Sequence, residues 1–478
     1  MATIYLYVQG TEHIGILAEK EEVQEIQIVR PDSSSKVGNI YVAKVVNVET
    51  SLQAAFIEYG GGKLGFLPKK EVPEARQQPD RPLRSILTEG QRIIVQVTKD
   101  AYQQKGAKLT ANITVPGTHI VYLPFGEYIA VSRKLADEHR NVLREKGKKW
   151  IENREGAIFR TSSQVTDITT LEAEWKQLRR KWEELYKASQ TSSVPSPLYT
   201  ENPLSKWIRK FQTNQLDAIY IDEVQAANRL KLELPSFASI IKWEKQFPIS
   251  ISLNPLYNRL SNPRVFTPHG VEIWIEQTEA LTVIDVNSST FTKGYSKEDT
   301  SFRTNQEAAR EIAKQLRLRN ISGIIMIDFL KMKAADQAKL LQMFQLELRK
   351  DGIRTELYGF TKLGLLEMTR KRESDSIPSI LGGDIHSPRT FSMETYAYMM
   401  ERELLVAKEE ALVVDVHPTV LHVFKEKIME RIRGKISSAI YFRKNTQASG
   451  YDIIRSGSSQ TINEFLASIP SDAIDKVF

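Results

Sequence analysis

The chain has 478 residues, 41% hydrophobic and 26% charged, a composition typical of a folded protein of about three domains. It contains no cysteine, which excludes disulfides, thiolate zinc sites, cysteine nucleophiles and iron–sulfur clusters. Lys and Arg number 66 against 59 Asp and Glu, and the net charge of +7 is compatible with a polyanionic partner. The N-terminus lacks a signal peptide, and no apolar run reaches the roughly 20 residues of a membrane span. The sequence therefore predicts a soluble, cytoplasmic protein without a membrane partner.

The first part of the chain has the pattern of short β-strands. Residues 1–30 alternate apolar and polar side chains as in a hairpin, and Pro31 begins a break. Further short strands are predicted at Ile40–Val48, Ala54–Tyr59, Gly65–Leu67, Arg92–Val97 and Leu109–Val115. So many short strands in one segment favour a small closed barrel, and the oligonucleotide-binding type is the leading candidate.

The middle and end of the chain change to a mixed pattern. Residues 170–188 predict a helix that buries one apolar stripe, formed by Leu171, Trp175, Leu178, Trp182 and Leu185. Residues 190–203 are rich in Ser, Thr and Pro, which indicates a linker. From residue 271 to 366 strands and a helix alternate, which implies a parallel sheet, and residues 389–478 indicate a small α+β domain.

Two matched strands that end in aspartate are the most informative feature. Residues 280–285 and 323–328 are apolar runs that stop at Asp285 and Asp328, with a predicted helix at Thr300–Asn320 between them. Such a β-α-β unit brings both acids to the carboxyl edge of a parallel sheet, where α/β sheets bind their ligands. Two carboxylates suit Mg²⁺ or Mn²⁺, and Asn287 is placed to orient a water or a phosphate. A second interpretation, that the acids are helix N-caps, stays open from the spacing alone.

At these residues the chain resembles the ribonuclease E/G family. The resemblance rests on Asp285-Val-Asn-Ser, on Ile327-Asp-Phe-Leu-Lys-Met, on Leu363–Arg370 and on the helix Thr304–Arg319. Gly38–Tyr41, Ser51–Phe56 and Gly65–Pro68 are similar to the S1 domain of that family, and Phe159-Arg160-Thr161 is similar to its sensor of RNA 5′ ends. Ordered matches from about residue 38 to 382 are more specific than any single motif.

The resemblance implies a multidomain architecture that combines α+β and α/β parts. An RNase H-like subdomain is expected to be interrupted by an S1 (OB-fold) β-barrel and a 5′-sensor region. A DNase I-like catalytic α/β domain and a small C-terminal α+β domain are expected to follow. The corresponding residues are 1–35 with 200–260, then 36–118, 119–199, 261–382 and 389–478.

The resemblance also implies a Mg²⁺-dependent endoribonuclease, with Mn²⁺ as an alternative ion. Such an enzyme hydrolyses phosphodiester bonds of single-stranded, AU-rich RNA in RNA processing or decay and leaves 5′-phosphate and 3′-hydroxyl ends. By resemblance the catalytic residues are Asp285, Asn287 and Asp328, and the metal ligands are Asp285 and Asp328. Asn287 is expected to hydrogen-bond the water or the scissile phosphate.

Further residues match contacts of the family with RNA. Phe56, Phe66 and Lys105 match the base-stacking and basic residues of the S1 domain, and stacking contributes about 1–3 kcal/mol per base. From composition alone, both phenylalanines could instead belong to the barrel core. Arg160 and Thr161 match the pair that contacts a 5′-monophosphate, and Arg354 is a weaker candidate for an RNA contact.

The chain departs from the family pattern at several positions. The family usually carries Cys-x-x-Cys after the catalytic sheet, but here Ser379–Pro388 offers only the lone His386. We therefore expect no zinc, and a homodimer would not be linked by zinc–thiolate bonds. Lys331 replaces a common acid, and Ser162-Ser163 follow the 5′-sensor pair. The alternative is an RNA-binding protein of the same fold with little or no turnover, and a DNA nuclease is a third possibility. The presence of all three catalytic residues favours the nuclease.

Overall fold

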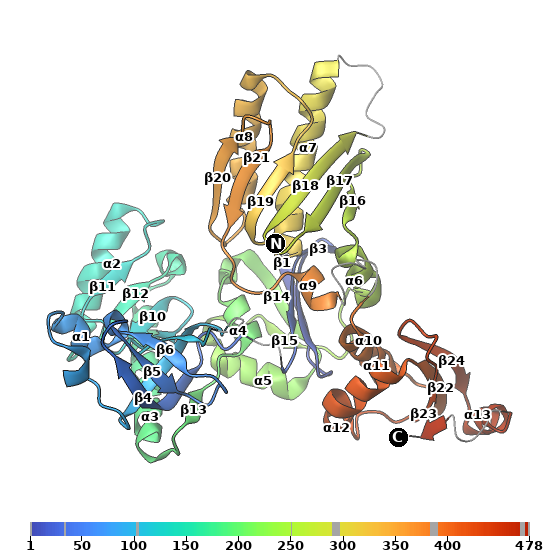
Figure 1. Ribbon diagram of the computed structural model, residues 1–478, viewed down its shortest axis with the longest axis horizontal. Helices are drawn as coiled ribbons and strands as arrows, with labels where there is room; N and C mark the ends of the chain where they lie inside the picture. Colours follow the sequence, from blue (N-terminus) through green and yellow to red (C-terminus); the bar gives the residue numbers. More distant parts are fainter. Residues whose placement is uncertain are drawn as a thin grey trace. The chain divides into compact units, whose positions relative to one another are not determined.

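The computed structural model describes residues 2–32, 35–101, 105–249, 251–288, 297–382, 391–468 and 474–476 (Figure 1). The chain forms two compact units, each assembled from separate stretches of sequence. The first unit contains Met1–Asp32, Leu216–Ala227 and Ile240–Phe478, and the second contains Ser33–Gln215 with Asn228–Ser239. Among the described residues, no helix combines the length and the hydropathy that crossing a membrane requires.

Five strands of the second unit close into a β-barrel. They follow the order β4 (Ile40–Glu49), β5 (Ala54–Glu58), β6 (Gly65–Pro68), β8 (Lys108–Thr110) and β7 (Arg92–Lys99). Pairing of β4 with β7 closes the ring, so the predicted small barrel is confirmed and is consistent with an S1 domain of the OB type. The last predicted strand is shorter than expected, because the chain leaves the barrel after Thr110.

The prediction of a linker at residues 190–203 is wrong in part. Its middle forms β13 (Ser196–Tyr199), which pairs antiparallel with β4 and adds a strand to the barrel sheet. Asn202 then caps α4 (Pro203–Ile208) by accepting a hydrogen bond from Leu204 N at 3.1 Å. A segment rich in Ser and Pro lacks helical periodicity, but its backbone can still complete a sheet edge.

A second sheet and two long helices follow the barrel in the same unit. The strands are β9 (Val115–Pro116), β10 (Ile120–Leu123), β11 (Ile129–Val131) and β12 (Gly156–Phe159). They are covered by α2 (Asp137–Trp150) and α3 (Ile168–Thr191). The predicted helix is confirmed as α3, where Leu171, Trp175, Leu178 and Trp182 are buried and Leu185 is half-buried. The shorter helix α1 (Pro73–Gln77) lies earlier in this unit.

The first unit begins with a five-stranded sheet of the order β15-β14-β1-β2-β3. The predicted N-terminal hairpin is confirmed, since β1 (Ala2–Tyr7), β2 (His13–Glu19) and β3 (Glu22–Val29) are antiparallel neighbours. β14 (Leu216–Ile221) and β15 (Ile241–Trp243) extend the sheet in parallel with β1. The helices α5 (Val224–Glu233) and α6 (Leu253–Ser261) occur in the same part of the sequence.

A six-stranded sheet, which we call the aspartate sheet, follows in the order β16-β17-β18-β19-β21-β20. Its strands are β16 (Arg264–Phe266), β17 (Val271–Gln277), β18 (Leu281–Ser288), β19 (Gly323–Asp328), β20 (Thr355–Phe360) and β21 (Leu366–Arg370). Helices α7 (Lys297–Leu318) and α8 (Ala334–Leu348) cover one face and bury alternate side chains of the strands. β18 and β19 are parallel neighbours joined by α7, so the predicted β-α-β unit is confirmed.

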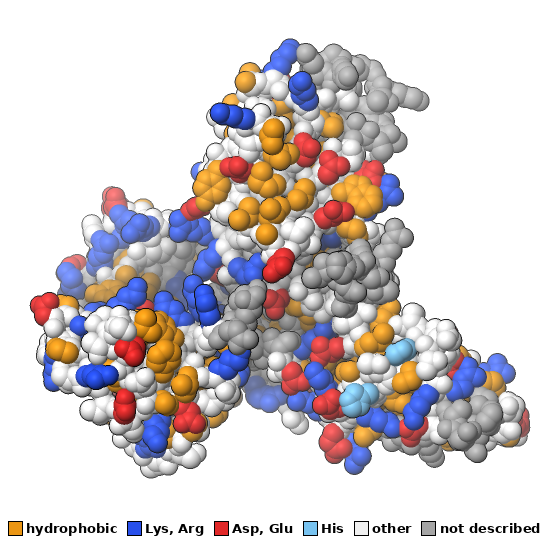
Figure 2. All heavy atoms as spheres, in the orientation of Figure 1, with side chains coloured by type: hydrophobic (Ala, Val, Ile, Leu, Met, Phe, Trp, Pro, Cys, Tyr) orange, Lys and Arg blue, Asp and Glu red, His pale blue; other side chains and the backbone are white. Residues whose placement is uncertain are grey.

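The other face of the aspartate sheet carries neither helix (Figure 1). We call it the open face. Figure 2 shows hydrophobic side chains gathered on this face with acidic side chains among them, and Val283, Ile324 and Tyr358 are among its exposed apolar residues. Because side chains of a strand alternate between faces, the two aspartates can be assigned to this face from their register.

The C-terminal part of the first unit is a small α/β layer. Its sheet has the order β24 (Tyr451–Gly457), β22 (Ala411–Val416), β23 (Ala439–Lys444) and β25 (Ile474–Lys476). Its helices are α10 (Met393–Val406), α11 (Pro418–Val423), α12 (Met429–Ile432) and α13 (Ser459–Leu466), and α9 (Ile377–Leu381) precedes them. A core that includes Tyr398, Phe424 and Phe442 joins the helices to the sheet.

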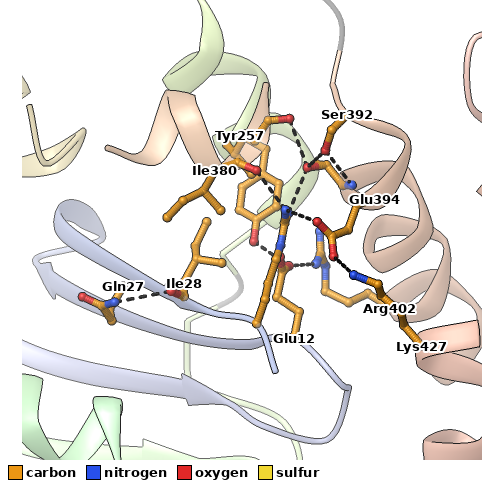
Figure 3. A network of polar contacts seen from close by, with 12 residues as sticks. Glu12, Gln27, Ile28, Tyr257, Ile380, Ser392, Glu394, Arg402 and Lys427 are labelled. Carbon is orange, nitrogen blue, oxygen red and sulfur yellow. Dashed lines mark hydrogen bonds and ion pairs between the residues drawn. The ribbon is translucent and has the colours of Figure 1, made fainter. Parts of the chain in front are cut away.

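A buried network of charges connects the N-terminal strands with α6, α9 and α10 (Figure 3). The Glu12 carboxylate pairs with Arg30 at 2.7 Å and with Arg402 at 2.5 Å, and it accepts a hydrogen bond from the Tyr257 hydroxyl at 2.9 Å. Arg30 also donates to the Ile380 carbonyl at 2.8 Å. The network therefore ties together segments that are far apart in the sequence.

Candidate functional site

Asp285 and Asp328 lie directly opposite each other in the register of β18 and β19. Directly opposite residues point to the same face, and neighbouring strands lie about 4.8 Å apart. Asp285 is half-buried and Asp328 is exposed, whereas Ile284 and Ile327 point into the core beneath α7 and α8. The alternation of the two strands thus aims both carboxylates at the open face, at the carboxyl end of the parallel pair.

Neither aspartate caps a helix. The residue before α8 is Lys333, and α7 begins only at Lys297. The interpretation of the acids as N-caps is therefore wrong. Asn287, two residues after Asp285, instead donates a hydrogen bond from Nδ2 to Asp285 Oδ2 at 2.7 Å. This bond orients the Asp285 carboxylate, and within the described residues its other oxygen accepts no hydrogen bond.

The segment that follows Asp328 is held by α7. Asn305, which is fully buried, accepts a hydrogen bond from Leu330 N at 2.9 Å and donates one to the Leu330 carbonyl at 2.7 Å. Phe329 packs into the core between these residues. The second aspartate is therefore followed by a segment whose backbone has little freedom, which favours a fixed carboxylate position.

The donor set fits a hard divalent cation. Within the described residues, no group of three or more His, Cys, Asp or Glu side chains is arranged to hold a metal, so Asp285 and Asp328 form a pair without a third such ligand. Mg²⁺ is bound by oxygen atoms, often by one or two carboxylates, and keeps several waters or takes phosphate oxygens as its other ligands. A structural zinc ion, which takes all four of its ligands from protein side chains, does not fit this arrangement.

The two phenylalanines of the barrel lie on its outer surface. Phe56 on β5 is directly opposite Phe66 on β6, and their ring centres are 6.0 Å apart at an interplanar angle of 66°. Both rings are partly exposed, whereas Ala55, Ile57 and Leu67 beside them form the barrel core. The interpretation of these phenylalanines as core residues therefore does not hold.

Lys105 lies close in sequence to the strand that pairs with Phe66. It is exposed and precedes Gly106, where a Cβ would lie 1.9 Å from the Leu64 carbonyl oxygen. Glycine at this position therefore permits the close approach of the two backbones. Next in the chain, the Ala107 carbonyl accepts a hydrogen bond from Phe66 N at 2.8 Å.

Arg160 and Thr161 directly follow β12, an inner strand of the second sheet of their unit. Arg160 N donates to the His119 carbonyl at 2.8 Å, and the Thr161 hydroxyl lies 3.0 Å from that of Ser132. Burial and the nearby Arg209 lower the pKa of the Arg160 guanidinium, which stays charged at neutral pH. In the described part of the chain, no hydrogen bond or ion pair engages this guanidinium.

The two serines that follow the pair anchor the loop to His119. The Ser162 hydroxyl lies 3.0 Å from His119 Nδ1, and Ser163 Oγ donates to the His119 carbonyl at 2.9 Å. Burial, followed by the charge of Arg160, lowers the pKa of His119, so its imidazole is neutral at physiological pH. The departure from the family pattern at Ser162 and Ser163 thus has a local structural reason.

The structure does not bring Arg354 together with the aspartates. Arg354 precedes β20 at the end of the sheet where Thr355 pairs with Arg370 and Arg370 pairs with Gly323, the first residue of β19. Asp328 is the last residue of that strand. The Arg354 side chain is also engaged by Glu356 through a hydrogen bond of 2.8 Å from Nε.

Sequence reasoning missed residues that tertiary pairing places near the acids. Lys362, exposed in the turn between β20 and β21, lies at the same end of the sheet as Asp328, because Ile327 pairs with Leu366. Trp274 on β17 is directly opposite Asp285. No local pattern marks either residue, since both are brought to the site by strand register. His386, the lone histidine where the family carries its zinc ligands, lies outside the described residues.

The fold and the site define a multidomain α/β protein with a closed five-stranded barrel and a paired-carboxylate site on an open sheet face. A sequence model of the Ribonuclease E/G family matches residues 114–373. Ribonuclease G of Escherichia coli K12 is 32% identical over 411 residues, which cover 80% of this chain and 83% of that protein. Ribonuclease E of Synechocystis sp. PCC 6803 is 33% identical over 390 residues, covering 77% of this chain and 58% of that protein. The chain belongs to the ribonuclease E/G family.

Proposed function

We propose that this protein is a Mg²⁺-dependent endoribonuclease that hydrolyses phosphodiester bonds of single-stranded, AU-rich RNA in RNA processing or decay. Membership of the ribonuclease E/G family supports the endoribonuclease activity and the RNA substrate. The observation that carries the proposed metal chemistry is the directly opposed pair Asp285 and Asp328 on an open sheet face. The expected products carry 5′-phosphate and 3′-hydroxyl ends.

Asp285 and Asp328 are the proposed metal ligands, and Asn287 completes the catalytic set. Mg²⁺ held there, or Mn²⁺ in its place, would neutralise charge on the phosphodiester and activate a water for attack. Asn287 holds the Asp285 carboxylate through its 2.7 Å hydrogen bond, and its exposed side chain is available to the water or the scissile phosphate. Asn305 keeps the segment after Asp328 in place. We expect no zinc, because the chain lacks the cysteines of a thiolate link.

The second unit carries the proposed contacts with the rest of the RNA. Phe56 and Phe66 offer partly exposed rings for base stacking, and Lys105 offers a cation for the backbone. Arg160 and Thr161 are proposed to bind a 5′-monophosphate, since a guanidinium and a hydroxyl suit a terminal phosphate. Within the described residues the Arg160 guanidinium has no hydrogen-bond partner, and the charges of Glu174 and Glu201 nearby help to keep it protonated, which supports this role. Arg354 stays a weaker proposal for an RNA contact.

The proposed domain architecture follows the family. Residues 1–35 with 200–260 would form an RNase H-like subdomain, and β1 to β3 do share one sheet with β14 and β15. The S1 barrel at 36–118, the 5′-sensor region at 119–199, a DNase I-like catalytic domain at 261–382 and the small domain at 389–478 complete the proposal. We also propose a cytoplasmic location and a homodimer that is not linked by zinc–thiolate bonds.

The test is cleavage of a short AU-rich RNA that bears either a 5′-monophosphate or a 5′-triphosphate. Wild-type protein, Asp285→Asn and Asp328→Asn are compared with Mg²⁺ and with Mn²⁺, and RNA binding is measured alongside. We expect the wild type to cut and both variants to lose at least about 100-fold in rate while they still bind, because each loses a charged ligand. A preference for the monophosphate that Arg160→Ala abolishes would support the 5′-sensing role. Binding without cleavage by the wild type, or equal cleavage by the variants, would replace the nuclease with an RNA-binding protein.

A further inference from the structure

An aromatic cluster occupies the same face of the aspartate sheet as the two acids. The Arg264 guanidinium lies over two rings, with its Cζ 4.9 Å from the ring centre of Phe266 and 5.3 Å from that of Trp274. Phe266 is 57% exposed and Trp274 is partly exposed. We call Arg264, Phe266 and Trp274 the aromatic cluster.

Strand register places this cluster beside Asp285. Arg264 on β16 pairs with Trp274 on β17, and Trp274 pairs with Asp285 on β18. Asp285 in turn pairs with Asp328, so one row of side chains crosses four strands. Phe266 and Asn287 flank Glu272 in the adjacent row. Directly opposite side chains point to one face, with Cβ atoms about 5 Å apart.

Glu272 fixes the geometry of the cluster. Its carboxylate accepts a hydrogen bond from Trp274 Nε1 at 2.9 Å and forms an ion pair with Arg264. The hydrogen bond from Arg264 holds the pKa of Glu272 below its ordinary value, so the carboxylate is charged and neutralises the guanidinium. The indole is thus held in one orientation before any ligand binds, which reduces the entropy lost on binding.

We propose that Trp274, supported by Phe266 and Arg264, stacks on an unpaired RNA base next to the cleaved phosphodiester. This inference rests on the proposed function and adds a base subsite to the same site. Since Glu272 takes up the charge of Arg264, the cluster presents aromatic faces rather than a free cation, and such a surface suits a base better than a phosphate. Trp274 is one strand away from Asp285, so a base one ribose from a phosphate at the aspartates reaches its ring.

A second copy of the chain fits this face less well. Strand register places Glu276 and Glu367 on the open face, in addition to the two aspartates. Acidic side chains lie among the apolar ones there (Figure 2). Two identical faces packed together would bring these like charges into contact. RNA avoids this conflict, because its bases are neutral and its phosphate would meet the cation that the aspartates are proposed to hold.

A scan with abasic nucleotides tests the stacking. Each position of a short single-stranded RNA is replaced in turn by an abasic nucleotide, and binding is measured with Ca²⁺ in place of Mg²⁺, so that cleavage is not required. In the wild type, we expect one abasic position near the aspartates to weaken binding by about 10-fold. Trp274→Leu should weaken binding of the intact RNA by about 10-fold and should make that position insensitive to loss of its base.

Trp243→Leu is the matched control. Trp243 is 49% exposed and lies on β15, in a different sheet of the same unit, so its replacement should change binding by less than about 2-fold and leave the scan unaltered. An identical abasic scan in the wild type and in Trp274→Leu would overturn the proposal. So would a change of oligomeric state in Trp274→Leu, measured by light scattering, without a change in the scan, because it would assign the face to a second copy.

The two proposals can fail separately. In one case, the abasic scan shows that binding depends on one base in the wild type and not in Trp274→Leu, but the wild type never cuts RNA with Mg²⁺ or Mn²⁺. This result would refute the nuclease and keep the stacking subsite. In the other case, the wild type cuts RNA, but the abasic scan is identical in the wild type and in Trp274→Leu. This result would keep the nuclease and refute the subsite.

Discussion

Asn305 on α7 forms hydrogen bonds with both backbone polar groups of Leu330, two residues after Asp328. The side-chain amide thus pairs with the backbone as a neighbouring strand would. The same helix connects the two strands that carry Asp285 and Asp328. The crossover helix therefore joins the two acidic strands and also holds the segment that leaves the second acid.

Replacement of Asn305 by alanine tests this positioning role. Asn305→Ala leaves the N–H and C=O of Leu330 without their partner, so we expect Asp328 to be less well ordered and kcat to fall by about 10-fold or more. The RNA affinity should change by less than about 2-fold, because Asn305 is buried and is not among the residues proposed to contact RNA. Steady-state kinetics and binding measurements on one RNA separate the two effects.

Asn320→Gly is the control for Asn305→Ala. Asn320 follows the other end of α7, where its amide donates to Ser374 Oγ at 2.8 Å and to the Asp375 carbonyl at 2.9 Å. Its φ of 51° is tolerated by glycine. The variant should lose stability but keep kcat. An equal loss of kcat in both variants would mean that Asn305 acts only through overall stability.

Phe56 on the outer surface of the barrel should contribute to RNA affinity rather than to folding. Phe56→Leu removes a stacking surface without opening the core, and we expect the affinity for single-stranded RNA to fall by about 10-fold. Tyr186→Leu, which replaces a 50% exposed aromatic residue on α3, should have little effect. Fluorescence anisotropy measures both affinities. A large fall in the unfolding temperature of Phe56→Leu would show instead that the ring is structural.

Asp222, at the end of β14, should make stability depend on pH. Burial raises its pKa to about 6, although its carboxylate accepts a hydrogen bond from Val8 N at 2.8 Å. A carboxyl with a raised pKa in the folded state binds protons more tightly there than in the unfolded state. The stabilisation that protonated Asp222 gives the folded state is therefore complete below about pH 4, and it is lost as the pH rises to about 6 and above.

Asp222→Asn should remove this dependence, because an amide oxygen can still accept from Val8 N without a charge. We expect the variant to be more stable than the wild type at pH 7 by up to about 3 kcal/mol, and the difference to vanish near pH 4. Thermal unfolding of both proteins between pH 4 and 8 measures it. A difference that is constant over this range would contradict the expectation.

Glu12 holds the buried charge network of Figure 3 together. Glu12→Ala leaves Arg30 and Arg402 without their shared carboxylate, and we expect a loss of about 3–5 kcal/mol in the free energy of unfolding. Glu430→Ala removes an exposed partner of Arg433 and should cost less than about 1 kcal/mol. Denaturant titration compares the two variants. Similar midpoints for both would show that the network contributes little to stability.

Much of the candidate site follows from local sequence. Asp285 and Asp328 end apolar runs typical of buried strands, and the helix between them carries an apolar stripe, so their parallel pairing is predictable. The five short strands likewise predict a closed barrel, because each is separated from the next by turn residues. The absence of cysteine excludes a thiolate link from composition alone.

The sequence did not predict which residues strand register brings to the site. Trp274 and Arg264 come beside Asp285 only through the pairing of β16, β17 and β18, and a shift of one residue would turn their side chains to the other face. Phenylalanine is a residue type common in protein cores, so the sequence does not show that Phe56 and Phe66 point outward. Only the closed barrel shows this. Register is decided by the burial of whole faces, not by any one strand.

Local periodicity and residue type thus encode the acid pair, the strands of the barrel and the absence of thiolate ligands for zinc. Tertiary structure decided which other side chains surround the acids and how distant segments are tied together. Glu12 and Arg402, for example, are separated by 390 residues and yet share a buried ion pair. Such contacts arise when separate elements pack to bury their apolar faces, and no local pattern records which polar groups then meet.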